Sequence, residues 1–249
     1  LWNTDWAYVS DEVYGTATGA GHGCPWGWAR MINISNPEVP TVEAEFRLPE
    51  NQPETCATWN PPPCCVPKRC AFRIGHTSPL AGSGGETINA TRVIVHPEYT
   101  DTYDVSLFKL ARPSVFDPIA LANPSTDKDL WEPGDTARVI GYGGQVFQMP
   151  SIDGQLREVD VPVVSDEDCE TTVFQGIDEA TEVCAGNLEG TEDSCQGDSG
   201  GPLFVRDEQG QPVQMGVVSW GNGCAVPTQY GIYARVGDTT LYDWIQQTI

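Results

Sequence analysis

The sequence predicts an all-β fold, arranged as an antiparallel barrel or sandwich, from its strand-like segments and its composition. Short segments rich in β-branched and apolar residues recur between turn signals, a pattern typical of all-β domains. The 249 residues include 26 Gly and 20 Pro but only 9% aromatic residues, so the chain is rich in loops. A chain of this length can bury a sizeable core as one domain or as two packed subdomains.

Seven segments are expected to form strands: residues 92–96, 104–110, 136–143, 155–164, 201–205, 214–220 and 231–236. Residues 111–135 are rich in Pro, Asp and Asn and are expected to connect two halves. Near the C-terminus, Asp238 can cap a helix. The apolar face of that helix would pack on the core and consists of Leu241, Trp244, Ile245 and Ile249.

Residues 33–70 show neither the two-residue alternation of a strand nor the 3.6-residue period of a helix. The stretch contains the run Pro61-Pro-Pro63, the adjacent cysteines Cys64 and Cys65, and no clear strand or helix pattern. We expect an irregular loop, of a length that is uncommon inside a compact domain.

The charge of the chain restricts its partners. The formal net charge is −22, from 35 acidic and 13 basic residues. This charge argues against nucleic acids and anionic membranes as partners, because both carry negative charge. The negative charge favours cationic peptides as ligands, or an environment of high salt concentration. An acidic surface that serves only solubility explains the charge equally well.

Nine cysteines suggest an oxidising compartment, and their odd number leaves one thiol without a partner in the chain. No apolar run approaches the length of a membrane helix. Residues 1–12 lack the basic start and apolar core of a signal peptide. We expect a secreted protein that acts as a monomer.

The most specific motif is the segment Asp193-Ser-Cys-Gln-Gly-Asp-Ser-Gly-Gly-Pro202, here called the nucleophile loop. A serine hydroxyl attacks an acyl group only when a base takes its proton, and the resulting oxyanion needs fixed N–H donors. Gly197 lets the backbone turn so that its own N–H and that of Ser199 converge. These features predict Ser199 as a nucleophile in acyl transfer.

The nucleophile loop resembles that of the trypsin-like serine proteases, and the resemblance extends over most of residues 72–249 and weakly over 13–32. Bacterial members are the most similar, because the second half is compact and lacks one disulfide common in the animal enzymes. The resemblance implies two packed antiparallel β-barrels with a C-terminal helix and a site in the cleft between them. It implies a secreted endopeptidase that cleaves peptides and proteins after Arg or Lys, with no metal or organic cofactor.

The resemblance also assigns the other members of the site. Residues 102–110 are similar to the segment that carries the triad aspartate, which is then Asp104. His96 begins an HPxY-like turn and is expected to be a structural surface residue. Asp198 would pair with the ammonium of a new N-terminus, and Val13 stands at the position of that terminus.

Four residues match the family's substrate pocket. Asp193 would lie at its base and favour the cationic side chain of Arg or Lys. Ser219, Gly221 and Gly231 would line the walls, where the two glycines admit a long side chain. The resemblance implies the disulfides Cys169–Cys184 and Cys195–Cys224, the second of which would tie the nucleophile loop to the loop after Gly221.

The resemblance fails where the catalytic histidine belongs. The family has a TAAHC-like segment there, and this chain has Asn60-Pro-Pro-Pro-Cys-Cys-Val66, with Cys64 in place of the histidine. Cysteine cannot take the serine proton through one nitrogen while an aspartate orients the other. We do not expect His22 or His76 to reach Ser199, although His76 is the better candidate of the two.

The N-terminal match is weaker still. Val13-Tyr-Gly-Thr16 stands where the family has an IVGG-like start, but the second glycine is missing. Glu12 precedes Val13, so a trypsin-like activator would not cut there. We therefore divide the chain into an extra or propeptide-like segment, 1–12, and a protease domain, 13–249. Within that domain we expect a first barrel over 13–115 and a second over 116–249.

Two explanations fit the missing histidine. The chain is a protease homologue that lost its base and now binds or regulates, or residues 33–70 come from a misread frame. The family pattern stops near Asn33 and resumes abruptly at Ala71, which favours the second explanation. No family pairing accommodates the cysteines of the first half, which are Cys24, Cys56, Cys64, Cys65 and Cys70.

Overall fold

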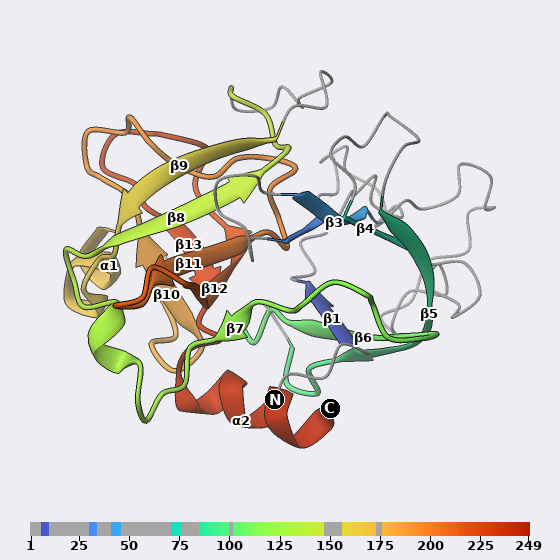
Figure 1. Cartoon of the computed structure of the whole chain (residues 1–249). Coiled ribbons are helices and arrows are strands. Elements are labelled where there is room, and N and C mark those ends of the chain that lie inside the picture. The colour runs from blue at the N-terminus through green and yellow to red at the C-terminus, as the bar shows by residue number, and fades with distance from the viewer. Residues whose placement is uncertain are drawn as a thin grey trace, which may run out of the picture.

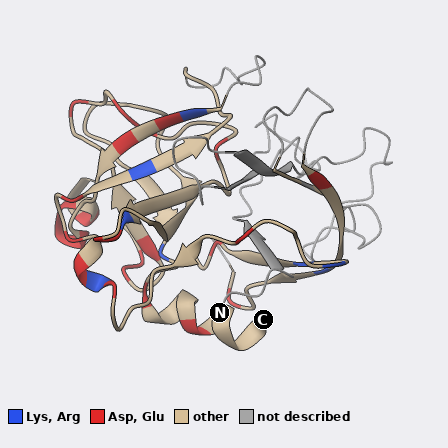
Figure 2. Ribbon diagram, in the orientation of Figure 1, with Lys and Arg blue, Asp and Glu red and all other residues tan. Residues whose placement is uncertain are grey.

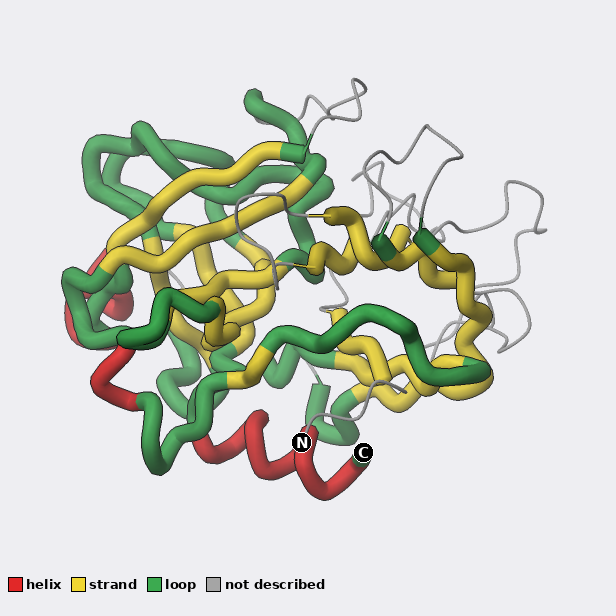
Figure 3. Tube along the Cα trace, viewed as in Figure 1, coloured by secondary structure: helices red, strands yellow, loops and turns green. Residues whose placement is uncertain are grey.

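The structure is a computed structural model that describes residues 6–9, 30–33, 41–45, 71–75, 85–99, 102–146, 156–172 and 176–249. In the first three of these ranges only the backbone strands are described. Strands make up most of the regular secondary structure of the described chain, and the helices lie at its periphery (Figure 3).

The first half contains two sheets. The larger has the strand order β1-β6-β5-β4, and every pair in it is antiparallel. Its members are β1 (Trp6–Val9), β4 (Ala71–Ile74), β5 (Glu86–Val95) and β6 (Ser106–Leu110). β2 (Arg30–Asn33) and β3 (Thr41–Glu45) form an antiparallel pair, and β3 lies beside β4.

The second half is a seven-stranded sheet in the order β10-β13-β12-β11-β8-β9, with β7 beside β12 (Figure 1). Its members are β7 (Ala120–Leu121), β8 (Thr136–Gly141), β9 (Arg157–Pro162), β10 (Glu182–Ala185), β11 (Pro202–Arg206), β12 (Pro212–Trp220) and β13 (Gly231–Ala234). The pair β7–β12 is parallel and the other ladders are antiparallel. The predicted architecture of two packed antiparallel β-barrels is confirmed, with that one parallel pair added.

Separate apolar clusters fill the two halves, and a third cluster joins them. The first half packs around Phe72, Ile88 and Phe108, and the second around Leu203, Met215 and Tyr233. The joining cluster contains residues of both sheets and of the C-terminal helix: Val105, Leu107, Leu121, Val217, Ala234, Val236, Leu241 and Ile245. Burial of this shared apolar surface holds the halves together.

The C-terminal helix α2 (Thr239–Thr248) forms as predicted. The side chain of Asp238 accepts a hydrogen bond from the amide of Thr239 at its start. Leu241 and Ile245 are fully buried, and Trp244 and Ile249 pack beside them. The helix therefore closes the joining cluster from one side.

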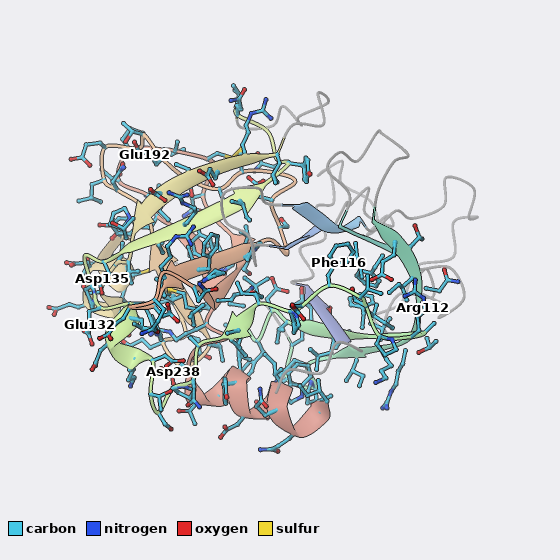
Figure 4. All side chains as sticks on the ribbon, viewed as in Figure 1. Arg112, Phe116, Glu132, Asp135, Glu192 and Asp238 are labelled. Atoms are coloured by element: carbon cyan, nitrogen blue, oxygen red, sulfur yellow. A yellow bond between two sulfur atoms is a disulfide. The ribbon has the colours of Figure 1, made fainter. Side chains whose placement is uncertain are left out.

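The connector also docks on both halves. Glu86 accepts hydrogen bonds from the guanidinium of Arg112, from Ser114 Oγ (2.5 Å) and from the amide of Val115 (2.9 Å). Arg112 and Phe116 lie beside β5 (Figure 4). Further along, β7 and a 3₁₀ turn (η2, Lys128–Leu130) belong to the second half.

The irregular loop expected over 33–70 is wrong at β3, where Thr41 and Val42 favour extended backbone. Residues 34–40 and 46–70 of that stretch lie outside the described residues. We missed the helix α1 (Asp166–Thr172) and its capping signal, in which Ser165 Oγ accepts from the amide of Asp168 (3.1 Å). The division of the chain at residue 116 stays a prediction.

Acidic residues dominate the described surface and are dense around α1 (Figure 2). Among the described residues, no helix is long and apolar enough to cross a membrane.

Candidate active site

The nucleophile loop is held in shape by glycine conformations and short backbone hydrogen bonds. Gly197 and Gly200 have φ angles of +96° and +79°, in the left-handed region that glycine adopts without steric cost. The amide of Gly200 donates to the carbonyl of Val218 (2.9 Å), and the amide of Val218 donates to that of Gly201 (2.9 Å). Ser199 directly precedes Gly200 and is thereby anchored to β12.

The carboxylate of Asp198 is enclosed by backbone. One oxygen accepts from the amide of Gly143 (2.7 Å) and the other from the amide of Cys195 (2.9 Å). A Cβ atom built on Gly141 would lie 1.8 Å from this carboxylate, and one on Gly143 would lie 2.4 Å from it. Gly141 at the end of β8 and Gly143 just after it therefore make room for Asp198. Val13, its expected N-terminal partner, lies outside the described residues.

Asp104 lies buried before β6, with 6% of its surface exposed. The backbone turns sharply just before it: Tyr103 has a φ of +55°, and the amide of Val105 donates to the carbonyl of Tyr103 (2.7 Å). Ser219 Oγ donates a hydrogen bond of 2.6 Å to Asp104 Oδ2.

Ser219 occupies a β-bulge. The register of β12 against β13 shifts between Val218 and Trp220, so Ser219 is the extra residue. A bulge redirects a side chain and is common beside active sites. Ser219 is buried and lines the same pocket as Ser199. It therefore connects the nucleophile's surroundings to Asp104.

A pocket that is open to solvent lies beside Ser199. We call it the Asp193 pocket. It combines three segments, the nucleophile loop, the end of β12 and the start of β13, and its lining consists of Asp193, Ser194, Cys195, Gln196, Ser199, Val218, Ser219, Trp220, Gly221, Gly223 and Gly231. The structure thus brings all four predicted pocket residues together with Ser199.

Asp193 supplies a carboxylate to this pocket. Its oxygens accept from the amides of Ser194 (2.8 Å) and Ala225 (2.9 Å). Burial raises the pKa of Asp193 to about 6, and the negative charge of Asp198 adds to the rise, while the two amide donors oppose it. The carboxylate is therefore mostly charged above that pH.

The two wall glycines differ in what they make room for. A Cβ on Gly231 would lie 2.6 Å from Asp193 Oδ1, whereas one on Gly221 would meet nothing closer than 3.5 Å. Gly231 is therefore needed for the carboxylate itself. A methyl group on Gly221 would make only ordinary van der Waals contacts with backbone atoms.

Sequence reasoning missed Ser194, Trp220 and Tyr233 around the pocket. Ser194 and Trp220 each follow a predicted pocket residue directly, and that adjacency was the available signal. Tyr233 is fully buried, and its hydroxyl donates to Ser194 Oγ (3.3 Å). A buried side chain of this kind gives no local sequence signal.

Disulfides brace the walls. Within the described residues, Cys169 is bonded to Cys184 and Cys195 to Cys224, with Cα atoms 6.0 and 5.1 Å apart. These are the pairs that the resemblance implied. The second joins the nucleophile loop, at the pocket-lining Cys195, to the loop after β12. The cysteines of the first half lie outside the described residues.

His96 is the described histidine, and it packs away from the pocket. Its Nδ1 accepts from the amide of Glu98 (3.2 Å), and its ring stacks on Tyr103 (4.7 Å) and contacts Trp244 (4.6 Å). Burial lowers its pKa, which keeps the acceptor nitrogen free of a proton. The expected surface position is wrong, because α2 covers the ring. His22, His76 and Cys64 lie outside the described residues.

Comparison with known proteins places the chain in a family. A family model described as Trypsin matches residues 64–245, so the match begins at Cys64, the residue that stands in place of the expected histidine. Anionic trypsin from Canis lupus familiaris is 34% identical over 189 residues, 74% of this chain and 73% of that protein. A trypsin from the bacterium Saccharopolyspora erythraea is 39% identical over 173 residues, 68% and 71% of the two chains.

The family model covers well over half of the chain. Ser199, Asp104 and Asp193 all lie within the matched range. The chain therefore belongs to the trypsin family of chymotrypsin-fold serine proteases, which are serine-type endopeptidases.

Proposed function

We propose that the Asp193 pocket binds the side chain of Arg or Lys in a peptide or protein substrate. The observation that carries the proposal is the carboxylate of Asp193 at the wall of a pocket that also contains Ser199. A carboxylate in a partly desolvated pocket favours a guanidinium or ammonium, because a neutral side chain leaves the charge unpaired. Cleavage would then follow that Arg or Lys.

The reaction we propose is acyl transfer. The hydroxyl of Ser199 would attack the carbonyl carbon of the Arg or Lys residue and pass its proton to a base, which would return it to the leaving amine. Water would then hydrolyse the acyl-enzyme and free Ser199. The N–H groups of Gly197 and Ser199 would hold the oxyanion, and the carboxylate of Asp104 would orient the base. The left-handed φ of Gly197 and the buried position of Asp104 support these roles.

No residue is identified as the general base, so we propose that this chain hydrolyses its substrate very slowly. The segment that would supply the histidine contains Cys64 instead, and the described histidine, His96, is held between Tyr103 and Trp244. Substrate binding does not need the base. The pocket is therefore proposed to bind arginyl ligands even where hydrolysis fails.

The experiment is the binding of benzamidine, an arginine mimic, at pH 8 by calorimetry. We expect the wild-type chain to bind and Asp193→Ser to lose at least about tenfold in affinity. The matched control is Asp117→Ser, which removes the same charge from an exposed site and should bind as the wild type does. Equal affinity of wild type and Asp193→Ser would refute the assignment of the pocket.

A second function from another class is a binding or regulatory protein on the same fold. The missing histidine favours it, since binding of a cationic peptide requires only the pocket. The Ser199→Ala variant separates the two functions, because a protease loses turnover and a binding protein loses nothing.

We also propose that the protein is secreted and acts as a monomer. The disulfides of the second half support an oxidising compartment. Detection of the chain in the medium rather than in cells, and its mass in solution by light scattering, would test the two proposals.

A further inference from the structure

Glu182 is a buried carboxylate that the proposed reaction does not use. It is the first residue of β10, with 4% of its surface exposed. A buried carboxylate without partners costs several kcal/mol, so its contacts must compensate for the lost water.

Two N–H groups satisfy the two oxygens of Glu182. The indole Nε1–H of Trp220 donates to Oε1 (2.7 Å), and the amide of Asp178 donates to Oε2 (2.8 Å). The turn that leads into β10 closes on the same residue, because the amide of Glu182 donates to the carbonyl of Asp178 (2.7 Å). The turn at Asp178 thus fixes the position of the carboxylate, whose other oxygen accepts the bond from Trp220.

The buried guanidinium of Arg235 binds the backbone of Glu182. Arg235 donates from Nε to the carbonyl of Glu182 (2.7 Å), pairs with Asp166 of α1, and lies over the ring of Trp131 at 5.7 Å. Burial raises the pKa of Glu182 and the negative charge of Asp178 adds to this, while the two N–H donors and the charge of Arg235 oppose the rise. The network runs from α1 to the indole of Trp220.

Trp220 stands where this network meets the pocket. It lies between Ser219 and Gly221 and lines the Asp193 pocket. Its ring packs on an apolar cluster that contains Cys169, Cys184, Tyr230 and Ile232. Apolar packing confines the ring to a few staggered rotamers, whereas one directional N–H bond to a charged acceptor favours a single one of them.

We propose that Glu182 is a positioning residue, which sets the orientation of Trp220 in the pocket wall and thereby the affinity for arginyl ligands. This inference rests on the proposed function of the Asp193 pocket. Glu182 does not touch the ligand and acts only through the indole.

The test combines ligand binding with a signal from Trp220 itself. The chain is labelled with 5-fluorotryptophan, and the ¹⁹F resonance of Trp220 is assigned from its loss in Trp220→Phe. Glu182→Ala should shift or broaden that resonance and weaken the binding of an arginyl tripeptide about tenfold. Glu182→Gln retains an oxygen for the indole and should recover most of the affinity. Glu179→Ala, an exposed change in the same turn, should alter neither signal.

A double-mutant cycle with Trp220→Phe gives a second and independent readout. If Glu182 acts through the indole, then Glu182→Ala should add less than about twofold to the loss already caused by Trp220→Phe. Additive losses would overturn the inference. Should Glu182→Ala fail to fold, Glu182→Leu, which fills the space but offers the indole no acceptor, carries the same cycle.

The outcomes separate this inference from the proposed function. Loss of benzamidine binding in Asp193→Ser, together with an unchanged Trp220 resonance and full affinity in Glu182→Ala, would overturn the inference and leave the pocket assignment intact. Unchanged benzamidine binding in Asp193→Ser would overturn the proposed function first.

Discussion

Ser219 donates a hydrogen bond of 2.6 Å to Asp104, although 115 positions separate the two residues in the chain. Asp104 precedes β6 of the first half, and Ser219 lies on the bulge of β12 in the second. Both side chains are buried. This single bond therefore joins the two barrels at the place where the proposed substrate is held.

The first prediction concerns that bond. Ser219→Ala should lower the free energy of unfolding by about 1–3 kcal/mol, because a buried carboxylate loses a donor. Urea denaturation measures the change. The exposed Ser125→Ala is the matched control and should stay within about 0.5 kcal/mol of the wild type. Equal stability of the two variants would mean that the bond contributes nothing net.

The second prediction concerns pH. The pKa of Asp193 is raised to about 6, so its charged form prevails above that pH and is lost as the pH falls through it. The benzamidine dissociation constant should be flat near pH 8 and should rise below pH 6, by up to about tenfold per unit. Calorimetry from pH 8 to pH 4.5 measures the profile. A flat profile over this range would show that Asp193 does not hold the cation.

The third prediction compares the wall glycines. Gly231→Ala should weaken benzamidine binding more than Gly221→Ala does, by about tenfold or more, because only the first methyl group meets the carboxylate of Asp193. Both variants are measured in the same titration. Gly210→Ala, far from any neighbour but with a φ of +77°, controls for backbone strain and should leave the affinity unchanged. A larger loss in Gly221→Ala would contradict the geometry.

The fourth prediction concerns turnover. This chain should hydrolyse an arginyl amide on the order of 10⁴–10⁶ times more slowly than an ordinary trypsin, because no histidine occupies the segment expected to supply the base. Ser199→Ala controls for contaminating protease. Activity within tenfold of trypsin, abolished in that control, would prove the prediction wrong. His76→Ala and His22→Ala would then identify the base.

If another reading frame across residues 33–70 encodes a TAAHC-like segment, the repaired chain should be active. Translation of the nucleotide sequence in three frames decides whether that chain exists. A repaired chain that binds benzamidine but stays inactive would point to the binding function instead.

Local patterns predicted the elements whose cause is local. Each of the seven expected strand segments overlaps an observed strand, and Asp238 caps α2, because alternation and capping act within a few residues. The motifs likewise placed Ser199 and Asp193 on one loop. The resemblance to a known family supplied the two disulfides and the paired barrels.

The relations between distant segments could not be predicted in this way. The bulge at Ser219 depends on how β12 pairs with β13, and the bond from Trp220 to Glu182 depends on the docking of β10. His96 was expected at the surface, since nothing in its own segment reveals that Trp244 will cover it. Such contacts arise from tertiary packing, which overrides local preference.

The central, buried position of β12 limits how the ligand selectivity of the Asp193 pocket can be changed by design. Every residue of β12 except Trp220 is buried, and the strand lies between β11 and β13. Buried central strands exchange their amides last and open only with the whole domain. The inner wall of the pocket therefore cannot yield to a bulkier side chain. New selectivity would have to be engineered into a surface loop such as 187–192, because loops accept altered sequence more readily than buried strands do.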